Sequence, residues 1–125
     1  MVAGGDSFSI RTRLHAEGYI IVPCKIGPFY VFDMVLHTTR PLSYLSPDAA
    51  DAASLFGDLT WVGGDIHRVR NMTIDGRPFP DLFVRISSGP AILGFDGFLG
   101  LHFLKQFSQV CFDQTTGLLT VSYGS

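Results

Sequence analysis

Residues 34–47 read MVLHTTRPLSYLSP, and this stretch decides how the chain is interpreted. The apolar residues 34–36 lead into a short polar loop that begins at His37. Ser46 and Pro47 then supply a hydroxyl group and a proline, which are favoured at the cap and the first position of a helix. The stretch therefore predicts a strand that ends at His37, a loop, and a short helix that begins near Pro47.

Short strand patterns fill most of the remaining chain. Residues 8–14 alternate apolar and polar side chains, the period of two that buries one face of a strand. Further strands are expected at 19–26, 29–36, 59–62, 66–74, 82–86, 110–112 and 118–123. Turns or loops are expected at 27–28, 75–76, 87–90, 96–97 and 116–117. Pro23 falls inside a strand and is expected at an edge or a bulge, because proline cannot donate to the ladder. This pattern, with one or two short helices, predicts an all-β fold built as a small barrel.

The composition describes one globular domain over residues 1–125, which can also be one domain of a longer protein. Aliphatic and aromatic residues make up 46% of the chain and charged residues 16%, so it has material for a core. The net charge of −2 and the lack of a Lys/Arg cluster argue against nucleic acid as a partner. No stretch has the ~20 apolar residues of a membrane span, and the start lacks the pattern of a signal peptide. We expect a soluble domain whose compartment is not indicated.

Cysteines and histidines show no spacing typical of a metal site. Cys24 and Cys111 lie far apart and belong to no C-x-x-C pair, so two free thiols are expected rather than a disulfide. His15, His67 and His102 are interpreted as surface or packing residues. We therefore expect no metal and no cofactor.

Residues 34–47 resemble the active-site segment of retropepsin-like aspartic proteases, the dimeric single-lobe enzymes of retroviral and bacterial type. In that family a hydrophobic strand runs into Asp-Thr/Ser-Gly-Ala, and a short helix opens a little further along. Here residues 34–36 run into the loop 37–40, and residues 45–47 fall where the family begins its helix. The resemblance implies that this loop is the active-site loop and that His37 occupies the position of the catalytic aspartate.

Two later segments extend the resemblance over about residues 8–123. Residues 96–104, DGFLGLHFL, are similar to a family segment in which two apolar residues and a glycine lead into a short helix behind the active-site loop. That motif is carried here by Phe98, Leu99 and Gly100. Residues 112–121, FDQTTGLLTV, match the closing hairpin, and Gly63 and Gly64 fall at the glycine-rich flap. The resemblance implies a closed barrel of the acid-protease type and a homodimer.

The active-site loop departs from the family where the chemistry is done. In an aspartic protease each subunit contributes one carboxylate, and the two share a proton and activate water. Here His37 replaces the aspartate, Thr38 keeps the hydroxyl position, Thr39 replaces the glycine and Arg40 replaces a small residue. Two imidazoles do not reproduce a carboxylate pair that shares a proton. We therefore expect a retropepsin-like homologue without acid-protease activity.

Other acidic and aromatic residues offer weaker alternatives. Asp33 lies four positions before His37 and is not followed by the family motif, so it is the less favoured catalytic candidate. Asp96 before Gly97 is interpreted as a turn residue rather than a catalytic acid. Trp61 is interpreted as a core or flap-base aromatic rather than a residue that stacks on a ligand.

Three functions are compatible with this pattern. The favoured one is an inactive dimerisation or peptide/protein-binding module. The alternatives are an active aspartic endopeptidase, and the His-bearing half of an asymmetric aspartic protease. For the homodimer we expect residues 8–14 or 118–123, together with Thr38, near the interface.

Overall fold

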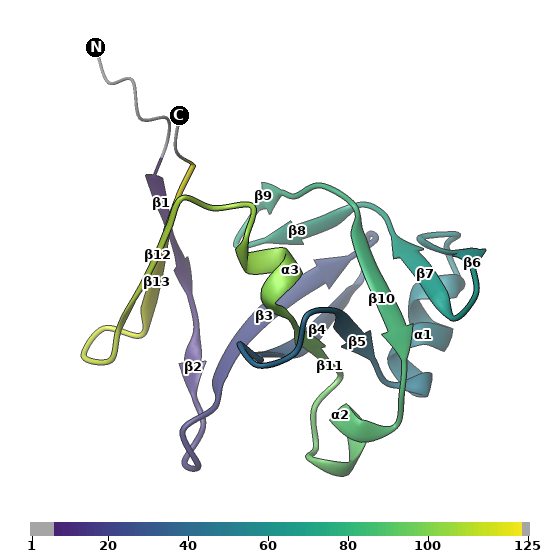
Figure 1. Cartoon of the computed structure of the whole chain (residues 1–125), viewed down its shortest axis with the longest axis horizontal. Helices are drawn as coiled ribbons and strands as arrows, with labels where there is room; N and C mark the ends of the chain where they lie inside the picture. Colours follow the sequence, from purple (N-terminus) through teal and green to yellow (C-terminus); the bar gives the residue numbers. More distant parts are fainter. Residues whose placement is uncertain (1–6, 124–125) are drawn as a thin grey trace.

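The computed structural model describes residues 7–123, which form thirteen strands and three short helices (Figure 1). The strands are β1 (Ser7–Arg11), β2 (Arg13–Leu14), β3 (Ile20–Ile26), β4 (Tyr30–Leu36), β5 (Ser43–Leu45), β6 (Leu59–Gly63), β7 (Ile66–Val69), β8 (Met72–Ile74), β9 (Arg77–Pro78), β10 (Leu82–Ile86), β11 (Gly97–Leu99), β12 (Gln109–Asp113) and β13 (Leu118–Ser122). The helices are α1 (Pro47–Ser54), α2 (Gly89–Ile92) and α3 (Leu101–Leu104). None of these three helices has the length and apolar character needed to cross a membrane. The all-β class predicted from the sequence is confirmed.

The main sheet is curled into a half-barrel. Its strands follow the order β6-β7-β10-β5-β11-β4-β3-β8-β9, and β2 pairs with β3. Strand β11 lies between β4, to which it is parallel, and β5, to which it is antiparallel. Phe98 is therefore opposite Val35, and Leu99 is opposite Leu36. This crossing brings the two segments that carry the family resemblance side by side.

A second sheet, of order β1-β13-β12, stands at one end of the molecule (Figure 1). Ile10, Leu119 and Val121 point inward and are buried. The outward face is polar, and the hydroxyl groups of Ser9 and Thr120 lie 2.9 Å apart across the strands. Strand β13 is paired on both sides, so the free edges of this sheet belong to β1 and β12.

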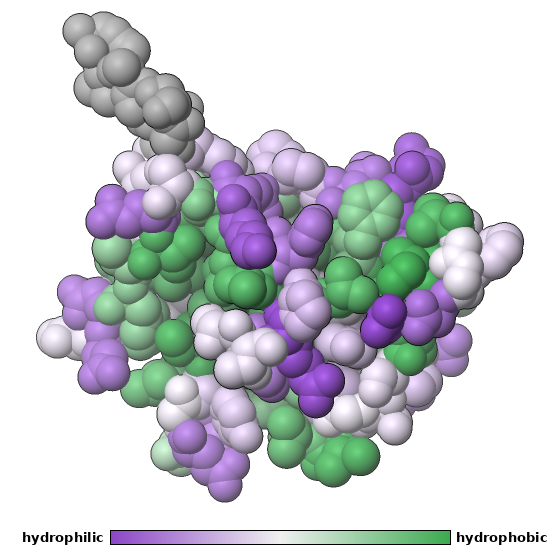
Figure 2. Space-filling view, in the orientation of Figure 1, coloured by the Kyte–Doolittle hydropathy of each residue, from purple (hydrophilic) through white to green (hydrophobic). Residues whose placement is uncertain are grey.

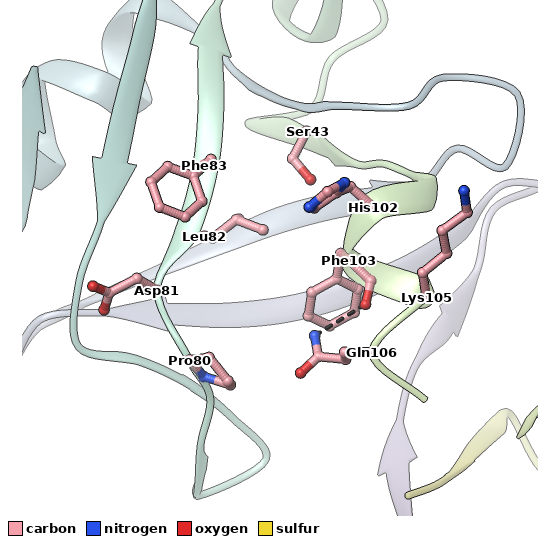
Figure 3. A pocket seen from close by; sticks show the side chains of 9 residues that line it. All are labelled: Ser43, Pro80, Asp81, Leu82, Phe83, His102, Phe103, Lys105 and Gln106. Carbon is pink, nitrogen blue, oxygen red and sulfur yellow. Dashed lines mark hydrogen bonds between the residues drawn. The ribbon is translucent and has the colours of Figure 1, made fainter. Parts of the chain in front are cut away.

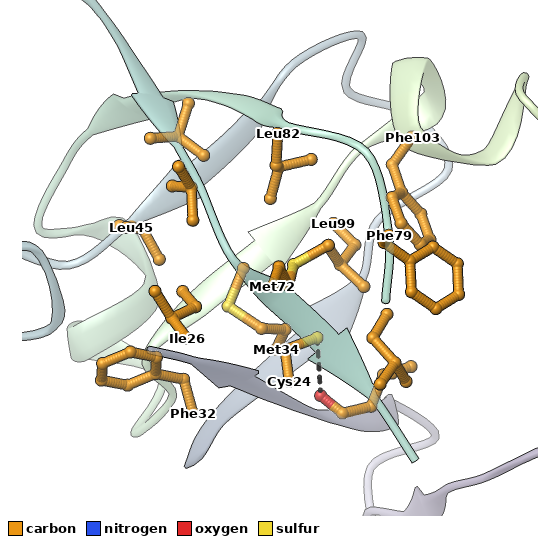
Figure 4. Packing of buried hydrophobic residues seen from close by; sticks show 14 of the residues in the cluster. Cys24, Ile26, Phe32, Met34, Leu45, Met72, Phe79, Leu82, Leu99 and Phe103 are labelled. Carbon is orange, nitrogen blue, oxygen red and sulfur yellow. Dashed lines mark hydrogen bonds between the residues drawn. The ribbon is translucent and has the colours of Figure 1, made fainter. Parts of the chain in front are cut away.

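The core lies inside the half-barrel and extends toward α3 (Figure 4). Met34, Leu45, Met72 and Leu99 are almost completely buried, and each such side chain contributes about 1.5–3 kcal/mol relative to exposure. Cys24 is also fully buried, and this burial raises the pKa of its thiol. The core therefore includes Leu99, which belongs to the same segment as the site described below.

Helix α1 begins where its sequence predicts and ends shortly before Gly57. The Ser46 Oγ accepts the N–H of Ala49 at 3.2 Å, and a proline occupies the first turn. The Gly57 N–H donates to the Ser54 carbonyl at 3.0 Å, with Gly57 at a φ of +76°. Alanine side chains on one face of this helix are buried against the sheet.

The prediction of one continuous strand at 66–74 is wrong, because this segment divides into β7 and β8 at Asn71. Asn71 has a φ of +57°, and its side-chain N–H donates to the buried Asp58 carboxylate at 2.7 Å. The Arg70 N–H also donates to the Asp58 carbonyl at 2.7 Å. The bend lets β7 pair with β6 and β10, while β8 pairs with β3.

The turn predicted at 96–97 is also wrong. The chain turns at Gly94, which has a φ of +86°, and Gly97 already belongs to β11. The loop expected at 87–90 is replaced in part by α2, which makes three short helices where one or two were expected.

The position of Pro23 follows from the ladder. On one side of β3, pairing with β2 ends at Ile21 and pairing with β8 begins at Cys24. Pro23 falls in the gap, where no donor is required on that side. Pro23 therefore lies at a local gap in the pairing of β3 and not at the edge of the sheet.

Candidate active-site loop

His37 lies where the chain leaves the end of β4. Its backbone N–H donates to the Leu99 carbonyl at 2.8 Å, which ties it to β11. Its ring lies 5.1 Å from the ring of Phe98, measured between centroids, at an angle of 58°. Its Nδ1 lies 3.0 Å from the Thr39 Oγ1, which donates or accepts according to the tautomer of the imidazole. The imidazole is thus held by neighbouring groups on both sides.

The remaining loop residues are exposed. Thr38, Thr39 and Arg40 face solvent, and the Arg40 N–H closes a turn to the His37 carbonyl at 3.4 Å. The Arg40 guanidinium lies 5.4 Å from the centroid of the Tyr44 ring, within the range of a cation–π contact. The loop therefore presents hydroxyl groups and a cation.

The backbone behind the loop is packed closely against Gly100. The Leu101 N–H donates to the Arg40 carbonyl at 2.7 Å, and the Gly100 N–H donates to the buried Ser43 Oγ at 3.0 Å. A Cβ atom at Gly100 would collide with the Leu42 carbonyl oxygen and would lie 2.9 Å from that of Arg40. Gly100 therefore allows a close approach of two backbone segments that a side chain would prevent.

The two aspartates considered from the sequence lie away from the loop itself. Asp33 is in the middle of β4, and its carboxylate pairs with the Arg13 guanidinium at 2.6 Å. His37 lies four positions further along the chain, a distance of about 13 Å in an extended strand. Asp96 accepts the N–H of Asp33 at 2.8 Å and returns its own N–H to the Asp33 carbonyl at 3.0 Å. Asp96 thus fastens the start of β11 to β4, a role that no local sequence pattern indicates.

The glycine pair Gly63 and Gly64 lies at the tip of the β6–β7 hairpin. Both have positive φ, and the ladder shifts register between Trp61 and Gly63. The Trp61 indole N–H donates to the Gly64 carbonyl at 2.9 Å, while the ring remains 67% exposed. Asp65 pairs with Arg85 of β10 at 3.1 Å. Trp61 is therefore not a core residue, and the action of this hairpin as a flap stays a prediction.

The other histidines are not brought together. His15 packs near Tyr19 and Phe95, His67 lies in β7, and His102 is exposed on α3. Within residues 7–123, no group of three or more His, Cys, Asp or Glu side chains could hold a metal ion.

Comparison with known proteins gives a structural match only. No protein-family model matches the sequence, and no curated protein matches it. A retropepsin-like aspartic protease from Rickettsia conorii matches with a TM-score of 0.68 at 15% identity, over 100% of this chain and 98% of the other. The retroviral protease-like domain of Ddi1 from Leishmania major matches with a TM-score of 0.56 at 18% identity, over 86% and 94%. The chain therefore has the retropepsin-like aspartic protease fold, as its sequence segments indicated.

Proposed function

We propose that this domain is a catalytically inactive retropepsin-like module that dimerises and binds a peptide or protein segment in the cleft between two copies. The observation that carries the proposal is His37 at the end of β4, whose backbone N–H donates to the Leu99 carbonyl and whose imidazole packs against Phe98. The sequence resemblance assigns this position to the catalytic aspartate.

The chemistry of the loop supports inactivity. Hydrolysis by this fold needs two facing carboxylates, one protonated and one ionised, to activate water and protonate the leaving group. Residues 37–40 contain no carboxylate, and the carboxylate of Asp33 is engaged with Arg13 in the middle of its strand. Thr39 and Arg40 add side chains where the family has glycine and a small residue.

Exposed apolar side chains support a binding role. Ile92 and Leu93 of the α2 region are 80% and 45% exposed, and Ile86 at the end of β10 is 39% exposed. Figure 2 shows an apolar area at the position of α2. Clustered apolar surface of this kind marks interaction sites. A second copy and its bound segment would cover it.

The decisive experiment measures cleavage of a diverse peptide library between about pH 4 and 8, the range near which carboxylate dyads work. We expect no turnover by the wild-type domain. Turnover that is lost in Asp33→Asn but retained in His37→Ala would make Asp33 catalytic and the domain an enzyme. Turnover lost in His37→Ala would instead assign water activation to the imidazole. Either result contradicts inactivity.

The rebuilt loop provides the complementary measurement. His37→Asp with Thr39→Gly restores the family motif, and we expect it to bring a statine-type inhibitor to measurable affinity while the wild type stays unbound. Tight inhibitor binding by the wild type would contradict the proposal, because such inhibitors place a hydroxyl group between two carboxylates.

Dimerisation has its own measurement. We expect light scattering at micromolar concentration to give twice the monomer mass, and Thr38→Arg to lower the dimer fraction by adding bulk and charge at the loop. Thr115→Arg is the matched control, because this threonine is exposed in the β12–β13 turn. A strictly monomeric mass with a well-folded spectrum would exclude the homodimer. Since β13 has no free edge, pairing between strands of two copies would use β1 or β12.

A further inference from the structure

The Phe98 ring joins the active-site loop to the elements beside it. Its centroid lies 5.1 Å from that of the His37 ring and 6.3 Å from that of the Tyr44 ring. Tyr44 of β5 is opposite Phe98 of β11 in the ladder, so both side chains leave the same face of the sheet. Helix α2 begins beside the ring, because a Cβ atom at Gly89 would lie 3.9 Å from it. The surface over this ring, formed by His37, Arg40, Tyr44 and α2, is called the Phe98 face below.

The Phe98 face carries one unopposed charge. Residues 37–46 and 86–95, which surround the ring, contain no Asp, Glu or Lys, and Arg40 is their only arginine. In the part of the chain that the structure describes, no carboxylate forms an ion pair with Arg40. Its guanidinium lies over the Tyr44 ring, 5.4 Å from the centroid. Stacking uses the flat face of a guanidinium and leaves the N–H groups in its plane free to donate.

The neighbouring charges are offset or distant. Arg85 of β10 lies next to Tyr44 in the ladder, and its guanidinium is 3.1 Å from the Asp65 carboxylate. Asp96 forms no ion pair among the described residues, but it precedes β11, whereas the loop is bonded to the other end of that strand. The potential over the loop is therefore positive and comes from Arg40.

Apolar surface lies next to this charge. An exposed arginine alone holds an anion weakly, because a surface ion pair contributes little. The exposed side chains of Ile92 and Leu93 in the α2 region and of Ile86 at the end of β10 can add apolar contacts. The Phe98 face thus suits a ligand that combines an anionic group with an apolar one.

The cavity between the start of β10 and α3 lacks this combination (Figure 3). Its volume is about 350 Å³, and no residue of the loop 37–40 lines it. Lys105 belongs to its lining, but in Figure 3 the ammonium group is directed away from the cavity. The Gln106 carboxamide donates back to the Phe103 carbonyl at 3.0 Å. The cation that can meet an anionic ligand is therefore Arg40 rather than Lys105.

We propose that the peptide segment bound in the cleft carries an anionic side chain that accepts hydrogen bonds from the Arg40 guanidinium, next to an apolar side chain that packs on the α2 region. This inference rests on the proposed function and names the class of peptide that the module would bind. Carboxylate and phosphate oxygens both match the parallel N–H groups of a guanidinium. Because the proposed cleft lies between two copies, it receives Arg40 from each of them.

A displayed library of random heptapeptides, panned against the wild type and against Arg40→Gln, tests this preference. We expect the wild type to enrich Asp or Glu at one position beside an apolar residue. Arg40→Gln should lose the acidic enrichment and keep the apolar one. Lys25→Gln is the matched control, because Lys25 is exposed in β3 near the β3–β4 turn, at the opposite end of β4 from His37. It should enrich the same acidic peptides as the wild type.

Synthetic peptides measure the contact itself. Replacing the acidic residue of an enriched peptide by its amide should weaken binding to the wild type by about 3- to 5-fold, the upper range for an exposed ion pair, and should not change binding to Arg40→Gln. Arg40→Lys should recover only part of the loss, since lysine keeps the charge and lacks the planar fork. A phosphoserine at the same position distinguishes the two sources: tighter binding than the acidic peptide assigns a phosphorylated segment, and equal or weaker binding assigns a carboxylate.

Two results would overturn the inference and leave the binding function intact. One is enrichment of peptides without acidic residues, and the other is enrichment of the same acidic peptides by Arg40→Gln. If no peptide is enriched by the wild type, the proposed binding function itself is contradicted, and the inference fails with it.

Discussion

Replacing Gly100 by alanine should destabilise the domain strongly, because the added methyl group has no room. Gly100 has a negative φ of −87°, so the substitution carries no conformational penalty and its effect is steric. The new Cβ would overlap the Leu42 carbonyl oxygen, lie 2.5 Å from the Leu42 carbonyl carbon and lie 2.9 Å from the Arg40 oxygen. All three are backbone atoms, which cannot rotate away as the end of a flexible side chain can.

The magnitude follows from the way the loop is held. The segment 40–42 is bonded to α3 through the Leu101 N–H at 2.7 Å and the His102 N–H at 2.9 Å, so it cannot retreat without losing these bonds. Overpacking of a filled site costs about 1–3 kcal/mol, and we expect Gly100→Ala to lie at the upper end, about 3 kcal/mol. A domain of this size loses roughly 3–5 °C of melting temperature per kcal/mol, so the midpoint should fall by about 10 °C.

Urea denaturation followed by circular dichroism measures this change, with Gly89→Ala as the matched control. A Cβ at Gly89 would make only ordinary contacts, at 3.5 Å from the Ser87 Oγ and 3.9 Å from the Phe98 ring. The control should stay within about 0.5 kcal/mol of the wild type. If Gly100→Ala loses no more stability than the control, the close approach of Gly100 to the backbone of residues 40–42 is not what holds the loop.

Three further results are expected. Cys111 is exposed, whereas burial raises the pKa of the Cys24 thiol, so a thiol reagent at about pH 8 should modify one cysteine rapidly; two rapid modifications would contradict this burial. The Arg11 side chain hydrogen-bonds Asp75 and lowers the pKa of that carboxyl group below its usual value. The pair therefore stabilises the fold at a pH above the ordinary carboxyl pKa, and this stabilisation is lost as the pH falls through the lowered pKa of Asp75. The difference in unfolding free energy between wild type and Asp75→Asn should accordingly shrink in acid. A difference that stays constant with pH would contradict the stabilising role of the pair. Amide exchange should be faster at the β6–β7 tip than in β11, and equal protection would mean that the tip does not open.

Much of the local structure could be predicted from the sequence, because neighbouring residues decide it. Ser46 and Pro47 determine where α1 begins, and both act within one helical turn. Asp75 and Gly76 form the predicted turn with φ values of +51° and +81°, conformations that these residue types tolerate well. The position of His37 at the end of a strand also followed from the apolar run before it.

Contacts between residues far apart in the sequence could not be predicted from the local pattern. The apolar run at 66–74 carried no signal that it divides, because the bend at Asn71 depends on the buried Asp58, thirteen positions earlier. Asp96 was interpreted as a turn residue because Asp-Gly is a turn signal. Its carboxylate instead accepts a hydrogen bond from the backbone N–H of Asp33 in β4. In both cases a partner distant in the chain outweighed the local preference.

The features of the loop 37–40 likewise depend partly on the sequence and partly on the tertiary structure. The sequence by itself determined that the loop 37–40 carries an imidazole, two hydroxyl groups and a guanidinium instead of a carboxylate, since these are properties of residue type. Only the tertiary structure decided that the Leu99 carbonyl holds the backbone of His37, that Phe98 packs against its imidazole, and that β13 has no free edge. These arrangements depend on which strands pair and on the space left between elements, and neither is encoded in the spacing of residues along one segment.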